Sequence, residues 1–375
     1  MKKIYSFIII ILFALISQAT SKNIHHTIFA NDSSKAMIVI EAQSNRILMA
    51  KNETVQRANA STTKIATFLT VLKHCKNFDQ KVKIDDRAIG IEGTSIYLKK
   101  GEQLTVEELL YGMMLVSGND AATALALHIS SSVEEFATLM TNEAKKCGAK
   151  NTTFKNPHGL DQNGHLTTAY DLAQIVRECY KYPLFEKIVT TKNTKITDST
   201  GNGYRYLKNK NKLLWTFDGA NGVKTGFTNN AGRCLVSSAK RDNMHLICVV
   251  LSCGPMFEES AIHLEECFNK YKMCTILNQN SYLTKIPVKN TDNELIDVYT
   301  KQGFSFPLTT EEKSNIKTIV NFYNNIIAPL NKDQIVGELE IYLNKHLIFS
   351  EKIYTMEEIK SNRIEDNIKN IISKW

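Results

Sequence analysis

The sequence predicts an α/β chain of the α+β type, in which a domain with an antiparallel sheet and a helical subdomain precedes a small all-β sandwich domain. Three observations predict this fold. Strand-like runs stand at both ends of the first two-thirds of the chain, with a helical block between them, so that one sheet is built from both ends. Short strand-like stretches broken by polar turns follow residue 278. The length of 375 residues suits two domains, and 43% hydrophobic and 22% charged residues are ordinary globular usage.

The first residues predict export. Lys2 and Lys3 form a positive region, and Ile4–Ile16 is an almost unbroken apolar run. The small residues that a signal peptidase needs follow at Ser17–Ala19. The apolar run is too short to cross a bilayer comfortably. We therefore expect residues 1–19 to be a signal peptide and the protein to act in the cell envelope, on the outer face of the cytoplasmic membrane; an uncleaved N-terminal anchor is the alternative.

Residues 23–277 are predicted to form the first, larger domain. Its apolar pattern changes from the period of a strand to the period of a helix and back again. The expected elements are strands at Ala36–Glu41 and Arg46–Lys51, helices at Ser61–His74, Val106–Leu115, Ala121–Ile129 and Val133–Cys147, and strands at Arg233–Lys240 and Met244–Leu251.

Residues 281–355 are predicted to form the β-sandwich domain. Its expected strands are Leu283–Val288, Leu295–Thr300, Ile335–Leu343 and His346–Tyr354.

Residues 356–375 are predicted to form an amphipathic helical tail. One helical face collects the apolar residues Ile364, Ile368, Ile371, Ile372 and Trp375. A terminal Trp with flanking Lys residues is typical of a helix that lies in the membrane interface. The alternative is a helix packed on its own β domain.

The charge balance argues against a nucleic-acid partner. Lys plus Arg number 46 and Asp plus Glu 38, which gives a modest net charge of +8 that is spread along the chain. An anionic polymer of the envelope is at least as consistent with this balance.

No cofactor and no metal are expected. The nine His residues show no His-Glu-x-x-His spacing, and the eight Cys residues show no Cys-x-x-Cys spacing. Cys234 and Cys248 lie in apolar, strand-like runs, which indicates small buried thiols. Most of the cysteines are expected to be structural thiols, and the sequence leaves disulfide pairing open.

One Ser-x-x-Lys pattern has the right context for nucleophilic catalysis. Ser61 is expected to open a helix, so Lys64 lies on the same face one turn later. A serine hydroxyl needs an adjacent base, and burial among the apolar residues that follow Lys64 would lower the lysine pKa enough to supply it. The matches at 237–240 and 314–317 fall in a strand and on a charged surface.

Two further short motifs have weaker meaning by themselves. Ser117-Gly118-Asn119 lies between two predicted helices, where a second serine could relay a proton; a simple helix cap is the alternative. Lys224-Thr225-Gly226 lies in a predicted strand, where Lys and Thr could bind a carboxylate and Gly allows close backbone approach. Its alternative is an edge-strand lysine that prevents aggregation.

Together the three motifs resemble the set found in penicillin-binding proteins and class A β-lactamases. The chain resembles the serine-type D-alanyl-D-alanine carboxypeptidases of low molecular mass, peptidase family S11. Further segments that resemble the family's sequences are Arg57–Ala60, Leu110–Leu115, Asn156–Asp161, Asn211–Trp215, Ala328–Leu330 and Val336–Leu339. The resemblance implies a serine β-lactamase/DD-peptidase-like domain, and it covers roughly residues 34–355.

The resemblance also implies roles for eight residues. Ser61 would be the acyl-ester nucleophile, Lys64 the general base and Ser117 the proton relay. Backbone N–H groups of Ser61 and Phe227 would form an oxyanion hole. The substrate would be bound by Asn119, Lys224, Thr225, Gly226 and Phe227. Peptidoglycan stem peptides would be the substrate and β-lactams the inhibitors.

Two positions depart from the family pattern. Some members carry His where this chain has Phe227, and some carry an Arg after the strand that ends near Ser252, where this chain has Cys253–Met256. Recognition of the terminal carboxylate would therefore depend more on Lys224 and Thr225.

Two other functions compete with the carboxypeptidase. A β-lactamase would need a carboxylate to activate the deacylating water, which His158–Asp161 does not resemble. A catalytically silent penicillin-binding or wall-docking protein is the second alternative, because a sequence cannot show turnover.

Overall fold

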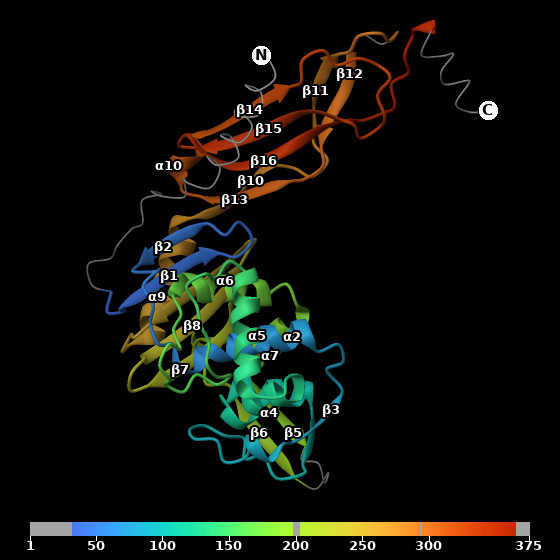
Figure 1. The fold of residues 1–375 in the computed structure, drawn as a ribbon. Coiled ribbons are helices and arrows are strands. Elements are labelled where there is room, and N and C mark those ends of the chain that lie inside the picture. Colours follow the sequence, from blue (N-terminus) through green and yellow to red (C-terminus); the bar gives the residue numbers. More distant parts are fainter. Residues whose placement is uncertain (1–31, 198–202, 293–294, 365–375) are drawn as a thin grey trace, which may run out of the picture.

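A five-stranded antiparallel sheet organises the larger domain of the computed structural model, which describes residues 32–197, 203–292 and 295–364 (Figure 1). The strand order is β2-β1-β9-β8-β7, so both ends of the domain contribute to one sheet, as predicted. Because β7 is at the edge of this sheet, one of its sides remains available to the helical subdomain. The strands are β1 (Ala36–Glu41), β2 (Ile47–Lys51), β7 (Ala220–Thr228), β8 (Gly232–Arg241) and β9 (Met244–Leu251).

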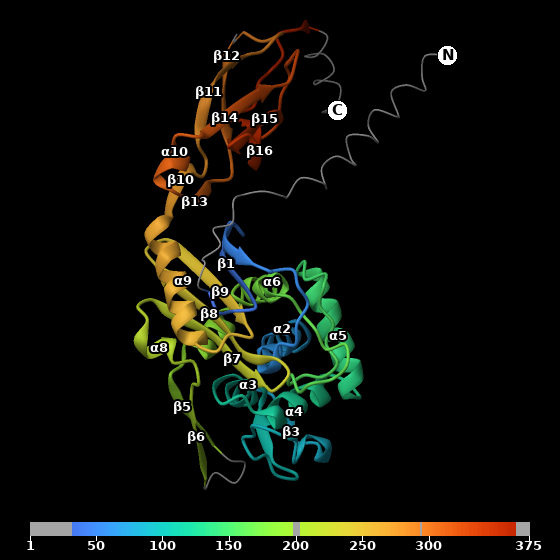
Figure 2. The ribbon, with the colours of Figure 1, turned by 90° about the vertical axis from the view of Figure 1, so that its left-hand side faces the viewer.

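Both faces of this sheet are covered, which explains the unbroken apolar sequence of its central strands. Ile38 and Ile40 pack in the core under the helical subdomain, whereas Met37 and Val39 pack under α9 (Met256–Lys270). Figure 2 shows α9 on one side of the sheet and α2 and α6 on the other. Alternate side chains of each strand therefore enter two separate cores.

The helical subdomain begins one turn later than the sequence predicts. Residues Ala60–Thr63 form a 3₁₀ turn, η1, and the regular helix α2 spans Lys64–His74. The other predicted helices are confirmed within two residues of their expected ends. The elements are η2 (Asp86–Ala88), α3 (Val106–Leu115), α4 (Asn119–Ile129), α5 (Val133–Lys146), α6 (Ala169–Cys179), α7 (Pro183–Thr190) and α8 (Leu213–Thr216), with short strands β3 (Lys81–Lys83) and β4 (Gln103–Thr105).

A two-stranded hairpin, β5 (Asn193–Thr197) and β6 (Tyr204–Lys208), extends from the larger domain at the end away from the second domain (Figures 1 and 2). It was not predicted from the sequence.

The C-terminal domain is all-β apart from one short helix, as predicted. A five-stranded sheet of order β11-β12-β16-β15-β14 lies beside the pair β10-β13, and β10 lies inside the range predicted for the larger domain. The elements are β10 (Lys272–Leu277), β11 (Tyr282–Pro287), β12 (Leu295–Thr300), β13 (Phe304–Leu308), α10 (Thr310–Lys313), β14 (Ile316–Phe322), β15 (Ile335–Leu343) and β16 (His346–Thr355).

The chain continues past β16 without leaving this domain at once. Ile359 is buried in the core of the C-terminal domain and pairs with Leu330 through an isolated β-bridge. Most of the predicted helical tail, residues 365–375, lies outside the described residues, as does the predicted signal peptide. Within the described ranges, none of the helices has both the length and the apolar character required to cross a membrane.

One arginine joins the two domains. Arg46, at the turn into β2, is 4% exposed and forms an ion pair with Glu312 of α10. Its guanidinium also donates to the Pro307 carbonyl and lies 5.1 Å from the ring centres of Tyr271 and Phe306. A buried cation needs compensating partners, and here they come from both domains, so Arg46 helps to hold the domains together.

The eight cysteines all fall within the described residues, and none forms a disulfide. Cys234 and Cys248 are fully buried in β8 and β9, as their apolar surroundings indicated. The fold is therefore held by its cores and its hydrogen bonds rather than by covalent cross-links.

Candidate active site

Ser61 and Lys64 form the centre of the site. The Lys64 ammonium lies 3.0 Å from Ser61 Oγ, 2.7 Å from Asn119 Oδ1 and 2.7 Å from the His158 carbonyl oxygen. Lys64 is fully buried. Burial, together with the charges of Lys224 and Lys210, holds the pKa of Lys64 well below its usual value. A neutral lysine in contact with a serine hydroxyl can act as its general base.

The 3₁₀ turn η1 presents Ser61 to this lysine. Asn59 is fully buried, and its side-chain amide donates to the hydroxyls of Thr62 and Thr63, both at 3.0 Å. Ala60 has φ +49°, in the left-handed region that a residue with a Cβ rarely adopts. Side chains three residues apart eclipse one another in a 3₁₀ turn, which brings Ser61 and Lys64 together across the start of α2.

Two glycines allow backbone to pack against this turn. A Cβ at Gly226 of β7 would lie 3.0 Å from the backbone nitrogens of Ser61 and Thr62. A Cβ at Gly159, which has φ +88°, would lie 1.9 Å from the Ala60 carbonyl oxygen. A side chain is excluded at Gly159 and would be tight at Gly226, so Ser61 is held closely between β7 and the loop 156–166.

The Ser117–Asn119 segment enters the site from the junction of α3 and α4, where it was predicted. Ser117 is 5% exposed and has φ +69°, and Asn119 is the first residue of α4. The Asn119 amide donates to the Glu92 carbonyl at 2.6 Å while its oxygen accepts from Lys64. Asn119 therefore positions Lys64, and its side chain does not act as a helix cap.

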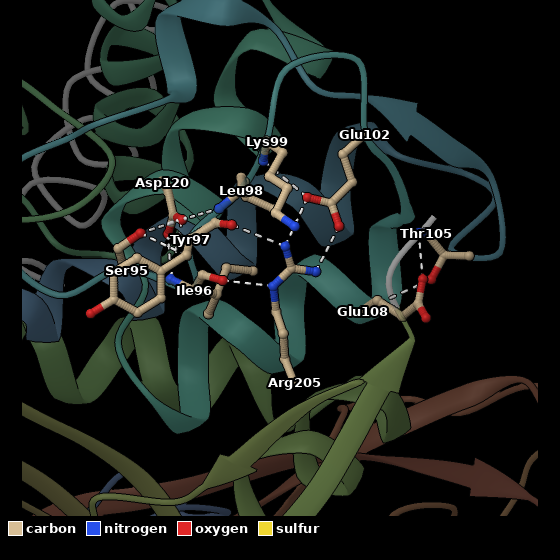
Figure 3. A network of polar contacts seen from close by, with 10 residues as sticks. All are labelled: Ser95, Ile96, Tyr97, Leu98, Lys99, Glu102, Thr105, Glu108, Asp120 and Arg205. Carbon is tan, nitrogen blue, oxygen red and sulfur yellow. Dashed lines mark hydrogen bonds and ion pairs between the residues drawn. The ribbon is translucent and has the colours of Figure 1, made fainter. Parts of the chain in front are cut away.

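Residue Asp120, next to Asn119, fixes the loop that borders the site. Its carboxylate accepts from the backbone N–H groups of Ile96 and Leu98 at 3.0 Å and 3.1 Å and from the Ser95 hydroxyl. Arg205 of β6 donates to the Ile96 carbonyl and to both carboxylate oxygens of Glu102. Figure 3 shows these contacts as one network between the loop, α4 and the hairpin. A network in which every buried charge has a partner is rigid.

A second lysine lies fully buried near the first. Lys224 of β7 is 1% exposed, and its ammonium donates to the Thr225 carbonyl at 2.9 Å. Burial and the charge of Lys210 lower the pKa of Lys224 to about 7. Near neutral pH this lysine therefore exchanges a proton readily.

The remaining predicted residues line the opening of the site along β7. Thr225 is half-buried, and Phe227 is 62% exposed. A cavity of about 340 Å³ lies next to Asn59 and Ala60 and is lined mainly by the loop Gly159–Leu166. Asp161 at its wall accepts from the Thr228 hydroxyl at 2.9 Å.

Sequence reasoning missed two contributors to this site. Lys210 was not singled out, although its charge lowers the pKa of both buried lysines. The His158 carbonyl was not assigned a role either, because a backbone acceptor leaves no trace in residue type. The resemblance of segment Asn156–Asp161 to the family's sequences was the one indication that this loop belongs to the site.

The residues most able to hold a metal lie elsewhere in the described part of the chain. His263 Nε2 is 3.6 Å from Asp32 and 3.7 Å from Glu259, on the α9 side of the sheet. Ser61 and Lys64 lie on the opposite side of the sheet, so this group does not contact them.

Each of the two domains matches the model of a known protein family. Residues 21–254 match the peptidase S11 family model, described as D-alanyl-D-alanine carboxypeptidase. Residues 271–361 match the model of the penicillin-binding protein 5 C-terminal domain.

Individual proteins are similar over almost the whole chain. D-alanyl-D-alanine carboxypeptidase DacF of Bacillus subtilis is 33% identical over 350 residues, which cover 91% of this chain and 90% of that protein. DacC of Escherichia coli is 30% identical and covers 91% of this chain and 89% of its own length. Among solved structures, penicillin-binding protein 5 of Haemophilus influenzae has a TM-score of 0.75 at 27% identity, with 89% of this chain and 100% of that chain covered.

Proposed function

The chain belongs to the peptidase S11 family of D-alanyl-D-alanine carboxypeptidases, and we propose that it removes the terminal D-alanine from peptidoglycan stem pentapeptides through an acyl-enzyme on Ser61. It is a serine carboxypeptidase, a hydrolase. The observation that carries the proposed mechanism is the 3.0 Å contact between Ser61 Oγ and the buried Lys64 ammonium group.

Acylation begins with proton transfer from Ser61 Oγ to neutral Lys64 Nζ. The alkoxide oxygen attacks the carbonyl carbon of the penultimate D-alanine, and the carbonyl oxygen becomes an oxyanion. Backbone N–H groups of Ser61 and Phe227 would donate to that oxyanion, and one such donor contributes about 3 kcal/mol to transition-state stability. The close approach of Gly226 to the Ser61 nitrogen supports this pairing of β7 with η1.

Collapse of the tetrahedral intermediate breaks the peptide bond. Ser117 passes a proton to the departing D-alanine nitrogen and, assisted by Lys224, takes one from protonated Lys64, so that Lys64 is neutral again. The lowered pKa of Lys224, about 7, supports this role because proton transfer is most efficient when the pKa is near the working pH.

Hydrolysis of the ester then regenerates Ser61. Lys64 takes a proton from water, the hydroxide attacks the acyl carbon, and Lys64 returns the proton to Ser61 Oγ as the ester bond breaks. A β-lactam would acylate the same serine, because its ring amide resembles the D-alanyl-D-alanine terminus. Asn119, Lys224, Thr225, Gly226 and Phe227 would bind the substrate backbone and its carboxylate.

The envelope is the proposed place of action. Residues 1–19 would direct export and then be removed, and the helical tail would hold the protein on the membrane surface. Recovery of equal soluble fractions with and without residues 362–375 would disprove the tail's role.

One experiment tests the main proposal. The purified mature protein is expected to release D-alanine from a pentapeptide stem and to be labelled by fluorescent penicillin, and Ser61→Ala should abolish both. Labelling without D-alanine release would indicate a silent binder. Rapid penicillin hydrolysis would indicate a β-lactamase.

A further inference from the structure

The outer face of the β5–β6 hairpin gathers aromatic and cationic side chains. Side chains alternate between the two faces of a strand, so Tyr204, Tyr206 and Lys208 of β6 share one face. Lys195 of β5 pairs directly with Tyr206 and therefore lies on the same face. We call these four residues, with Trp215 of α8, the hairpin face.

The aromatic rings of the hairpin face are unusually exposed. Tyr206 is 80% exposed, Tyr204 51% and Trp215 42%. The Lys195 ammonium lies 4.7 Å from the ring centre of Tyr204, and the Lys208 ammonium lies 5.9 Å from that of Trp215. Large aromatic side chains gathered at one exposed place mark a binding surface rather than a packing accident.

The opposite face of the hairpin is fixed to the domain. Ile196 and Leu207 are buried there, and Arg205 is bound to Glu102 and to the Tyr97 carbonyl (Figure 3). The hairpin face is therefore held by buried contacts beneath it, and a ligand would not have to order it.

The hairpin face continues into the acyl site. Two residues after Lys208, the Lys210 backbone N–H donates to the Leu115 carbonyl at the end of α3. The Lys210 ammonium lies 3.4 Å from the Thr94 hydroxyl, and its charge acts on Lys64 and Lys224. A polymer bound at the acyl site could thus extend along β6 without a break.

We propose that the hairpin face binds the glycan strand of peptidoglycan while a stem peptide occupies the acyl site. The C–H-rich faces of pyranose rings stack on exposed aromatic rings, whose faces are electron-rich. Lys195 and Lys208 complement the carboxylates of neighbouring stem peptides. The inference rests on the proposed function, since the polymer is the same substrate.

A double variant, Tyr204→Ala/Tyr206→Ala, tests this face in the full mature protein. Each lost ring weakens stacking, and the two together should reduce affinity for purified, teichoic-acid-free insoluble peptidoglycan about tenfold, measured by co-sedimentation. The rate of D-alanine release from polymer, relative to release from a soluble sugar-free tripeptide, should fall by the same factor. Tyr206→Phe keeps the ring and should retain binding.

The matched control is Tyr282→Ala/Tyr323→Ala, which removes two equally exposed rings, 54% and 53%, from the C-terminal domain. It should leave co-sedimentation and the polymer-to-tripeptide ratio as in the parent protein. An unchanged ratio and unchanged sedimentation in the hairpin variant would overturn the proposal. The proposal would also be overturned if the parent protein bound only peptidoglycan that carries teichoic acid, or if the control variant lost as much affinity as the hairpin variant. If the parent protein does not process the tripeptide, the proposed function fails, whereas sedimentation still tests the glycan face.

Discussion

The two domains bury different kinds of side chain. The core of the C-terminal domain is built from residues such as Ile296, Val298 and Ile353, whereas the larger domain fully buries Lys64 and Lys224. A buried charge without partners costs several kcal/mol, so the second arrangement survives only where many contacts compensate for it.

Backbone conformation differs in the same way. Most left-handed non-glycine residues described in the C-terminal domain are turn-formers such as Asn280, Asn290 and Asn344. In the larger domain Ala60 and Ser117, which gain nothing from this conformation locally, adopt it beside the nucleophile. Backbone strain and two buried lysines thus occur together around Ser61, whereas the core of the β domain is apolar.

The largest effect is expected where the buried charge itself is removed. Lys64→Gln takes away the base that activates Ser61 and should slow penicillin acylation by about 10³-fold, measured by stopped-flow or gel labelling. Lys73→Gln is the control, because this lysine is on the same helix but forms an exposed ion pair with Glu178. Equal acylation rates in the two variants would contradict the assigned role of Lys64.

Two glycine-to-alanine variants separate the cost of left-handed backbone strain from the cost of a steric clash. Gly159→Ala combines a left-handed alanine with a clash against the Ala60 carbonyl, and should lower the free energy of unfolding by about 3–4 kcal/mol and impair acylation. Gly148→Ala has the same φ strain, at +90°, but its Cβ meets no atom within 4 Å. It should cost about 1 kcal/mol and spare acylation. Denaturant titration measures the free energy of unfolding of both variants. Similar losses would show that the surrounding structure relaxes enough to relieve the clash.

A buried cation contributes to the contact between the domains. Arg46→Met leaves Glu312 and the Pro307 carbonyl without their partner and should lower the free energy of unfolding by about 3 kcal/mol. Arg87→Met, which removes an exposed arginine paired with Asp85, should have little effect because water screens that pair. If both variants unfold at the same denaturant concentration, the interdomain contact contributes no stability.

The smallest expected effect is a slope of stability against pH. Below pH 7 Lys224 is protonated in both the folded and the unfolded state, and its contribution is constant. Between about 7 and its ordinary value of 10.5 only the unfolded state keeps the proton, so raising the pH stabilises the fold by at most about 1.4 kcal/mol per pH unit.

Comparison of the parent protein with Lys224→Met isolates that slope. Unfolding free energies measured from pH 7 to 8.5 should rise more steeply in the parent. Parallel curves over this interval would mean that Lys224 keeps its proton in the folded state.

Much of the site could be predicted because its chemistry depends on short spacings. The contact of Ser61 with Lys64 follows from three-residue spacing at a helix start, and the Ser117–Asn119 segment follows from the junction of two amphipathic helices. Residue spacing does not predict which groups surround Lys64, because Asn119 and the His158 carbonyl come from distant segments. The lowered lysine pKa was therefore a hypothesis about burial that only tertiary structure could support.

Two of the missed fold elements, strand β14 and the β5–β6 hairpin, share one physical cause. Strand β14 exposes most of its residues at the edge of a sheet. The pattern of the β5–β6 hairpin is weak because Tyr204 and Tyr206 place aromatic residues where a polar face is expected. Periodicity detects burial, so elements or faces that are exposed escape it.

The absence of disulfides has a consequence for how this protein tolerates its surroundings. Burial raises the pKa of Cys234 to about 11 and that of Cys248 to about 12, so almost no thiolate forms at neutral pH. Because thiol–disulfide exchange and oxidation proceed through the thiolate, these sulfurs are insulated from both oxidants and reductants. The core around β8 and β9 is therefore expected to keep the same structure under oxidising and reducing conditions.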